Sequence, residues 1–187
     1  MGYDDALNLA AQKLTQIPPQ EICLKCGVRY EDGEFFIPWF NTEKALSSAS
    51  VSHKILWLHY LTADGIQKPS GHLIAYREAA PALFYETNFN KRAVKPLVNH
   101  FGKNPQSLIA TGTALGGQKA DMGDTAVTLH VLPYLPMTFI IWEASEEFPP
   151  DGNILFDQTA KTWFAAEDLA IIASLAVYDL IAASKQL

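Results

Sequence analysis

The pattern of apolar and polar residues places the centre of the fold in residues 126–144, AVTLHVLPYLPMTFIIWEA. The first half of this stretch alternates between apolar and polar residues, which is the period of a strand with one buried face. The second half contains the unbroken apolar run 139–142. This run suits a strand covered on both faces, although periodicity alone leaves a short buried helix open. Pro133 and Pro136 cannot donate hydrogen bonds to a ladder, so we expect both at the turn of an antiparallel hairpin.

The remaining apolar patterns predict helices and strands around this hairpin. Helices are expected where apolar residues recur every three or four positions and a capping residue, Gly or Pro bounds the segment. Asp32 and Gly33 form the pair best suited to a two-residue type I′ turn, which predicts a second hairpin. The expected helices cover residues 4–17, 19–26, 51–63, 81–101 (kinked or divided at Pro96), 105–115 and 165–184, and the expected further strands cover residues 28–31, 34–38, 43–46, 73–77 and 153–156.

Together these elements predict one α+β domain over residues 1–187, with a central, mainly antiparallel sheet packed by helices. Residues 1–27 form an N-terminal helical segment, and residues 28–187 form the core. The helices at 51–63 and 165–184 are expected against the sheet, because one is apolar on most sides and the other carries a long apolar stripe. A chain of 187 residues buries roughly 70% of its unfolded surface, so the core needs no disulfide or metal for stability.

Charge and composition narrow the possible partners. The formal net charge is -6 and the basic residues are scattered, so we expect no nucleic-acid partner. The acids between Glu143 and Asp151 predict a solvated loop after the second central strand. The most apolar window, residues 169–183, is shorter than the ~20 residues that a membrane span requires, so we expect no membrane partner. No secretory leader is recognisable, which favours the cytoplasm.

Cys23 and Cys26 are the most suggestive pair of side chains for metal or redox chemistry, because two thiols three residues apart can chelate a metal or exchange with a disulfide. A zinc or cluster site needs further thiolates or imidazoles, yet the chain has no other cysteine and no histidine pair at i, i+4 spacing. The thioredoxin pattern places such a pair at the start of a helix, whereas this pair ends one. We therefore expect packing and no metal site, with a metal- or redox-handling role as the last alternative.

Five other residues form a candidate ligand site. Arg77 and Glu78 follow a predicted strand, and Tyr85 lies on the next helix, so an arginine fork and an aromatic ring could bind an anionic or planar ligand. His130 on the central strand is the histidine best placed for proton transfer. Asp157 is either a buried acid facing a pocket or the cap of the following turn. Ordinary roles are open alternatives: Arg77 can simply pair with Glu78 or a nearby acid, and Tyr85 has the i, i+4 spacing to Phe89 of core packing. His130 can be a satisfied core or surface histidine.

Four segments carry a resemblance to a known family. They are ILWLHYL at 55–61, SGHLIAYREAAPALFYETNF at 70–89, VLPYLPMTFIIWEASEEFPPDGNILFD at 131–157 and FAAEDLA at 164–170. In their order and spacing, the chain resembles the family catalogued as domain of unknown function 3786. The resemblance implies a cytoplasmic protein, mainly of anaerobic bacteria and archaea, and supplies no catalytic residues. Some relatives are expected to carry an added iron–sulfur segment of the kind seen beside corrinoid methyl-transfer proteins, for which this chain lacks the cysteines.

The sequence therefore favours a non-catalytic accessory module of anaerobic metabolism that binds a small molecule or a protein, because no nucleophile, acid pair or metal constellation stands out. The alternative is a small-molecule enzyme with a pocket built on Arg77, Glu78 and Tyr85, assisted by His130. The sequence identifies neither the ligand nor a cofactor.

Overall fold

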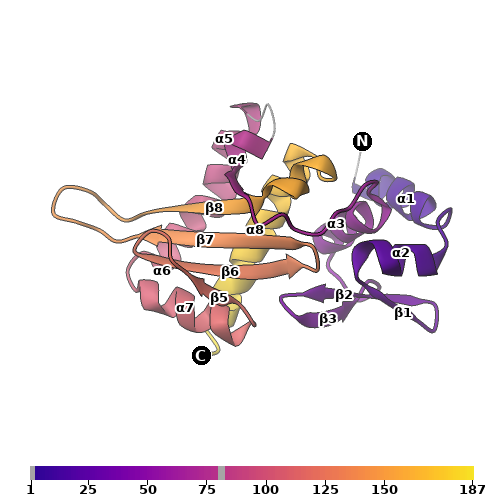
Figure 1. Ribbon diagram of the computed structural model, residues 1–187, viewed down its shortest axis with the longest axis horizontal. Coiled ribbons are helices and arrows are strands. Elements are labelled where there is room, and N and C mark those ends of the chain that lie inside the picture. The colour runs from indigo at the N-terminus through magenta and orange to yellow at the C-terminus, as the bar shows by residue number, and fades with distance from the viewer. Residues whose placement is uncertain (1–2, 80–82) are drawn as a thin grey trace.

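Two antiparallel sheets flanked by helices organise the molecule, which confirms the expected α+β fold (Figure 1). The computed structural model describes residues 3–79 and 83–187. The strands are β1 (Arg29–Glu31), β2 (Glu34–Trp39), β3 (Thr42–Ala45), β4 (Leu73–Ala75), β5 (Gln118–Ala120), β6 (Thr125–Leu132), β7 (Leu135–Trp142) and β8 (Asp151–Asp157). The helices are α1 (Tyr3–Leu14), α2 (Pro19–Cys26), α3 (Val51–Thr62), α4 (Tyr76–Ala79), α5 (Leu83–Phe89), the π-helix η1 (Asn90–Val94), α6 (Lys95–Phe101), α7 (Pro105–Ala114), the 3₁₀-helix η2 (Gln158–Thr162) and α8 (Ala166–Ser184).

The β6–β7 hairpin lies in the middle of the five-stranded sheet, whose strand order is β4-β8-β7-β6-β5. Pro133 lies in the turn as expected, but the same expectation for Pro136 is wrong. Pro136 lies inside β7 opposite His130, beside a register shift in β6. The β8 ladder begins only at Met137. Pro136 therefore has no ladder partner on its β8 side, where a residue without an N–H costs no hydrogen bond.

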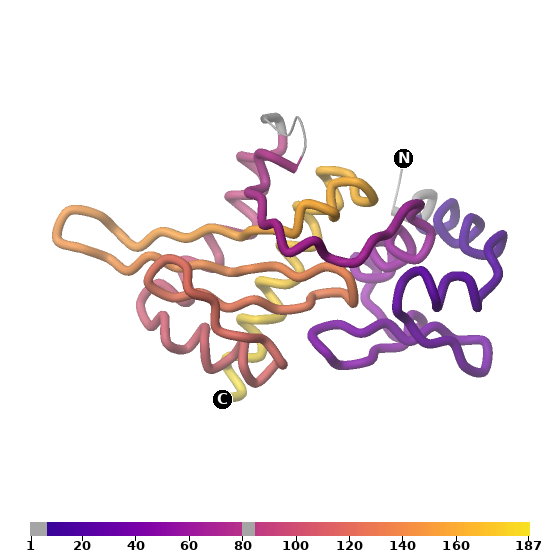
Figure 2. The backbone as a smooth tube through the Cα atoms, in the orientation of Figure 1, coloured from indigo at the N-terminus to yellow at the C-terminus, as the bar shows by residue number. Residues whose placement is uncertain are grey.

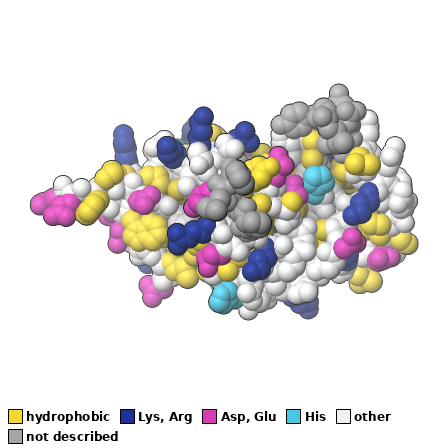
Figure 3. Space-filling model, turned by 90° about the horizontal axis from the view of Figure 1, so that it is seen from above, with side chains coloured by type: hydrophobic (Ala, Val, Ile, Leu, Met, Phe, Trp, Pro, Cys, Tyr) yellow, Lys and Arg dark blue, Asp and Glu magenta, His cyan; other side chains and the backbone are white. Residues whose placement is uncertain are grey.

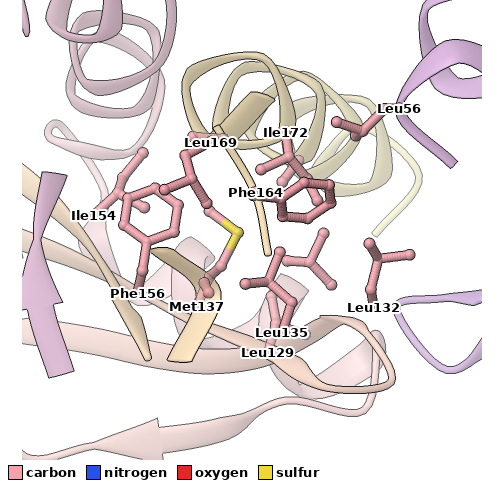
Figure 4. Packing of buried hydrophobic residues seen from close by; sticks show 14 of the residues in the cluster. Leu56, Leu129, Leu132, Leu135, Met137, Ile154, Phe156, Phe164, Leu169 and Ile172 are labelled. Atoms are coloured by element: carbon pink, nitrogen blue, oxygen red, sulfur yellow. The ribbon is translucent and has the colours of Figure 1, made fainter. Parts of the chain in front are cut away.

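Helices cover one face of the larger sheet. In Figure 1, α8 passes behind the sheet, with α6 and α7 beside it. Buried side chains from β6, β7 and β8 point toward α8 and meet Leu169 and Ile172 (Figure 4). Helix α7 approaches β6 at Gly112, where an added Cβ would lie 2.5 Å from Val127 Cγ2. Only glycine permits this approach, because any side chain would overlap the valine.

The first three helices and the smaller sheet, of order β1-β2-β3, pack beside the larger sheet (Figure 2). Helix α2 ends as predicted at Gly27, which is left-handed with φ 67°. Its Cα faces the β6–β7 turn, because an added Cβ would lie 3.1 Å from Pro133 Cβ. Helix α3 contacts α8, and one buried apolar cluster includes residues from both sheets. An extended segment then carries the chain from α3 across the sheet to β4 (Figure 2).

Several element boundaries differ from the predictions for local reasons. The strand expected at 73–77 ends at Ala75, whose N–H donates to the Glu78 carboxylate and so begins α4. Pro96 is the second residue of α6, and the helical region continues through it by way of the π-helix η1, which directly precedes α6. Pro81, the predicted start of that region, lies outside the described residues. Trp142, expected to be covered on both faces, is 40% exposed at the end of β7.

Candidate functional site

A cavity of about 950 Å³ lies where α1 and the end of α3 face the junction between η2 and α8. Its volume falls in the range of small-molecule sites. Three segments that are far apart in the sequence form its walls. They contribute Leu9, Ala10, Gln12, Lys13 and Gln16, then His59, Thr62, Ala63 and Asp64, and finally Thr162, Trp163, Phe164 and Ala165. Because Leu9, Lys13 and Asp64 are exposed, the cavity opens to solvent on this side.

Aromatic side chains give the cavity a rigid apolar wall. Trp163 and Phe164 are 8% and 4% exposed, and their ring centroids lie 4.8 Å apart. Both rings also pack on Tyr60 of α3, at 5.5 Å and 6.3 Å between centroids. The Tyr60 hydroxyl donates a hydrogen bond of 2.6 Å to the carbonyl oxygen of Cys26, which fixes the ring. The small exposed part of Trp163 and Phe164 gives the cavity an apolar surface that a ligand can contact.

His59 provides the cavity with an ionisable group held in one orientation. Its Nδ1 lies 2.9 Å from Asp168 Oδ1 of α8. This hydrogen bond raises the pKa of His59 above its usual value, and it outweighs partial burial, which acts in the opposite direction. No described residue pairs with Nε2 of the ring. The imidazolium can therefore donate a second hydrogen bond to a ligand, with Asp168 balancing its charge.

Trp163 and the start of α8 place further N–H groups close to the cavity lining. The indole Nε1 of Trp163 is buried without a hydrogen-bond partner among the described residues, which is uncommon for a buried N–H group. Helix α8 begins next to it, and its N-cap, Ala165, has no side chain that can accept from the first turn. The first N–H groups of a helix lack intrahelical acceptors and carry partial positive charge. Glu167 and Asp168 in this first turn offset that charge, so His59 remains the main donor available to a ligand.

Lys13 and Asp64 form an ion pair across the cavity mouth, linking α1 to the end of α3. Lys13 Nζ lies 3.8 Å from Asp64 Oδ2, and both side chains are largely exposed. Such exposed pairs contribute about 0–1 kcal/mol. The pair can therefore open without a large cost, and Lys13 is able to turn toward an anionic ligand.

The structure places four of the sequence-predicted ligand residues away from this cavity. Arg77 is exposed on α4, and the Glu78 carboxylate accepts the N–H of Ala75. Tyr85 is 40% exposed on α5. His130 is exposed on β6, where its Nδ1 lies 3.2 Å from the carbonyl oxygen of Pro133. The described residues around the cavity include none of them, so a ligand role for these side chains stays a prediction.

Asp157, the fifth predicted residue, is completely buried at the end of β8. Its carboxylate accepts hydrogen bonds from the Ser70 hydroxyl, the Gly71 N–H, and both the N–H and the hydroxyl of Thr159. Burial alone would raise the pKa of Asp157, but these hydrogen bonds lower it by more. The carboxylate joins the turn before β4 to the start of η2, as a capping residue does.

Both cysteines are free thiols on α2. Cys26 is fully buried, and burial raises its pKa to about 12. At neutral pH almost none of the reactive thiolate is therefore present. Within residues 3–79 and 83–187, no group of three or more His, Cys, Asp or Glu side chains could hold a metal ion. Likewise, no helix in these ranges is long and apolar enough to cross a membrane.

A protruding hairpin carries a cluster of acidic residues in its loop. Residues 120–160 contain no Lys or Arg, and they include Asp121, Asp124, Glu143, Glu146, Glu147, Asp151 and Asp157. The β7–β8 hairpin extends beyond the helices, and Figure 3 shows acidic side chains at its tip. Its loop is exposed from Glu143 to Pro149, in agreement with the predicted solvated loop.

His59, Trp163 and Asp168 were not predicted as candidate site residues from the sequence, because His59 and Asp168 lie 109 positions apart. One signal was available. His59 falls within ILWLHYL and Asp168 within FAAEDLA, two of the segments that carry the family resemblance. The contact between the two segments forms only because α3 and α8 pack side by side in the fold.

Comparison with known proteins gives one family match. A family model described as domain of unknown function (DUF3786) matches residues 18–179 of the 187-residue chain. No curated protein and no solved structure matches. The matched residues include His59, Trp163 and Asp168 but not the α1 wall of the cavity. Because the match covers most of its length, the chain belongs to the DUF3786 family.

Proposed function

We propose that this protein is an accessory protein that binds a small molecule in the cavity between α1, α3 and the start of α8. The ligand would have a flat apolar body and a negatively charged group at one end. The observation that carries the proposal is the position of His59. Asp168 holds the ring and raises its pKa, so that Nε2 can donate to an anion beside an aromatic wall.

The hydrogen-bonding groups of the cavity support an anionic ligand. His59 and Lys13 are the ionisable donors among the lining residues. Asp64 is the one carboxylate among the described lining residues, and it is exposed and paired with Lys13. A neutral apolar ligand would leave the donors unpaired, which costs affinity. A carboxylate, phosphate or sulfonate would satisfy them.

The lining hydroxyls support binding rather than covalent chemistry in this cavity. Thr62 donates its hydroxyl proton to the Leu58 carbonyl oxygen at 2.7 Å, and Thr162 donates to the Thr159 carbonyl oxygen at 2.7 Å. Among the described residues, neither hydroxyl is hydrogen-bonded to a base that could remove its proton. A cytoplasmic location fits the two free thiols, because thiols persist in reducing compartments.

Binding of anilinonaphthalene sulfonate tests the proposal, because this fluorescent probe combines a flat apolar body with an anionic group. Its affinity would be measured by fluorescence and by isothermal titration calorimetry. His59→Gln is expected to weaken binding about 10-fold, the loss of about 1.4 kcal/mol for one charge-assisted hydrogen bond. Binding by the unmodified protein should also weaken as pH rises through the raised pKa of His59, because the ring then loses its charge.

His130→Gln is the matched control, since His130 is an exposed histidine outside the cavity. It should leave the affinity for the probe unchanged. If His130→Gln weakens binding and His59→Gln does not, the cavity is not the site, and the ligand residues predicted from the sequence become the better candidates.

A further inference from the structure

A chain of polar side chains joins three elements at the start of α3. The hydroxyl Oγ of Ser50, the N-cap of α3, lies 2.9 Å from His53 Nδ1. His53 Nε2 in turn lies 3.2 Å from Asp179 Oδ2 of α8. The indole Nε1 of Trp39 in β2 donates a hydrogen bond of 2.8 Å to the same carboxylate oxygen. The N-cap needs only the hydrogen bond from the His53 N–H to Ser50 Oγ, so these side-chain contacts call for another explanation.

The ionised Asp179 carboxylate determines which nitrogen of the His53 ring carries the proton. Burial alone would raise the pKa of Asp179, but the hydrogen bonds from His53 and Trp39 lower it by more, so the carboxylate is ionised at neutral pH. An ionised carboxylate favours the histidine tautomer with the proton on Nε2, and Nδ1 can then accept the proton of the Ser50 hydroxyl. Hydroxyl, imidazole and carboxylate occur in the same order in serine hydrolases, although the two ring nitrogens exchange roles here.

Aromatic packing holds the imidazole in place behind an accessible serine. The His53 ring meets Trp39 nearly edge-on, with centroids 5.0 Å apart, and meets Trp57 at 5.6 Å. The His53 side chain is 15% exposed, whereas Ser50 is exposed. A base fixed in this way needs no reorganisation before it takes a proton.

The first turn of α3 supplies donors beside the hydroxyl. The N–H of His53 bonds to Ser50 Oγ, and the N–H of Lys54 bonds to the Ser50 carbonyl oxygen. In the described chain, the N–H groups of Val51 and Ser52 have no acceptor, as is usual in the first turn of a helix. In hydrolases with a serine at a helix start, the N–H of the next residue stabilises the oxyanion.

We propose that Ser50, His53 and Asp179 form an acyl-transfer site, separate from the ligand cavity, that hydrolyses small, unhindered carboxylic esters. Ser50 Oγ attacks the ester carbonyl carbon while its proton passes to His53 Nδ1. The bond to the leaving alcohol then breaks, and that alcohol takes the proton. Water attacks the acyl-serine by the same route and releases the acid, which restores Ser50. Ser50 and Val51 lie on the exposed surface, so an unhindered ester can reach the hydroxyl without entering a pocket.

Labelling with an alkyl fluorophosphonate, a reagent that phosphonylates activated serines, tests this proposal directly. Mass spectrometry of the native protein should show one adduct, on the peptide that contains Ser50. Ser50→Asp should abolish the adduct while keeping a good N-cap. His53→Phe should slow labelling roughly 100-fold, because it removes the general base but keeps a ring of similar size. Asp179→Asn should slow it at least roughly 10-fold.

Ser48→Ala is the matched control, because Ser48 is a nearby exposed serine whose hydroxyl donates to the Ala45 carbonyl oxygen. It should label at the unaltered rate, and circular dichroism would verify that every variant is folded. If His53→Phe does not fold, Asp179→Asn still tests the role of His53 as the base, because Asp179 holds its ring. Hydrolysis of nitrophenyl acetate should fall in the same order across the variants. Absence of an adduct on Ser50, or equal labelling rates with and without the His53 ring, would overturn the proposal.

Discussion

Replacement of Asp157 by asparagine tests whether this buried carboxylate is structural. Asp157 Oδ1 accepts from the Thr159 N–H at 3.0 Å and from the Thr159 hydroxyl at 2.7 Å. Oδ2 accepts from the Gly71 N–H at 2.7 Å, and the Ser70 hydroxyl lies within 3.2 Å of both oxygens. In the best orientation of the asparagine, its carbonyl keeps the Thr159 bonds. Its NH₂ group then faces the Gly71 N–H, a donor opposite a donor.

The size of the effect follows from these contacts. Loss of the charged bond to Gly71 costs about 1.5–3 kcal/mol, and the remaining bonds weaken because the acceptor is no longer charged. We expect Asp157→Asn to lower the free energy of unfolding by about 3–4 kcal/mol, measured by urea denaturation followed by circular dichroism. Most proteins of this size have a free energy of unfolding of about 5–15 kcal/mol, so the variant should still fold.

The pH dependence gives an independent check. Because the folded pKa of Asp157 is lowered, the carboxylate stabilises the fold above its unfolded pKa of about 3.9. That stabilisation is lost as pH falls through the lowered folded value. The difference between wild type and Asp157→Asn should therefore be constant near neutrality and shrink in acid.

Asp151→Asn is the control for both measurements, because Asp151 is exposed and accepts only from its neighbour Gly152. It should change stability by about 0.5 kcal/mol or less. Equal stability losses in the two variants would refute the structural role of Asp157. An unchanged stability with weaker ligand binding in Asp157→Asn would instead support the ligand role predicted from the sequence.

Three further predictions concern packing and ionisation. Gly112→Ala should destabilise the fold by about 1–3 kcal/mol in urea denaturation, because the new methyl overlaps Val127, and adding Val127→Ala should recover part of the loss. Asp168→Asn should lower the pKa of His59 in an NMR titration. It should also destabilise the fold by about 1 kcal/mol or less, because the pair is partly exposed. This loss should be present below about pH 6.5 and disappear as pH rises through the raised pKa of His59 in the folded protein. Cys26 should resist iodoacetamide in the native protein, because it is buried with a pKa of about 12. The half-buried Cys23 of the same helix should react, as mass spectrometry would show.

Local signals in the sequence were enough to predict most elements. The Asp32-Gly33 turn forms with φ 49° and 83°, the positive values that a type I′ turn requires. Gly27 ends α2 in the left-handed conformation, and Ser50 caps α3. These features depend on the conformation of a few adjacent residues. The three-residue strand β5 went unpredicted, because its sequence, QKA, has no strand pattern of its own and depends on pairing with β6.

The candidate site was harder to predict, because its residues meet only through tertiary packing. His59 contacts Asp168 across the α3–α8 interface, and the chain Ser50–His53–Asp179 crosses the same interface further along. No periodicity links positions so far apart. The residues singled out from the sequence, such as Arg77, were chosen for chemistry that is visible within a short segment.

The most direct test of the ligand cavity is an NMR titration of the tryptophan indole N–H groups with anilinonaphthalene sulfonate. The chain has 4 tryptophans, and Trp163→Phe would identify the resonance of the residue that lines the cavity. The Trp163 indole resonance should shift in proportion to probe binding, while the indole resonance of the exposed Trp142 should not shift. A saturating probe that shifts Trp142 and leaves Trp163 unchanged would contradict this prediction.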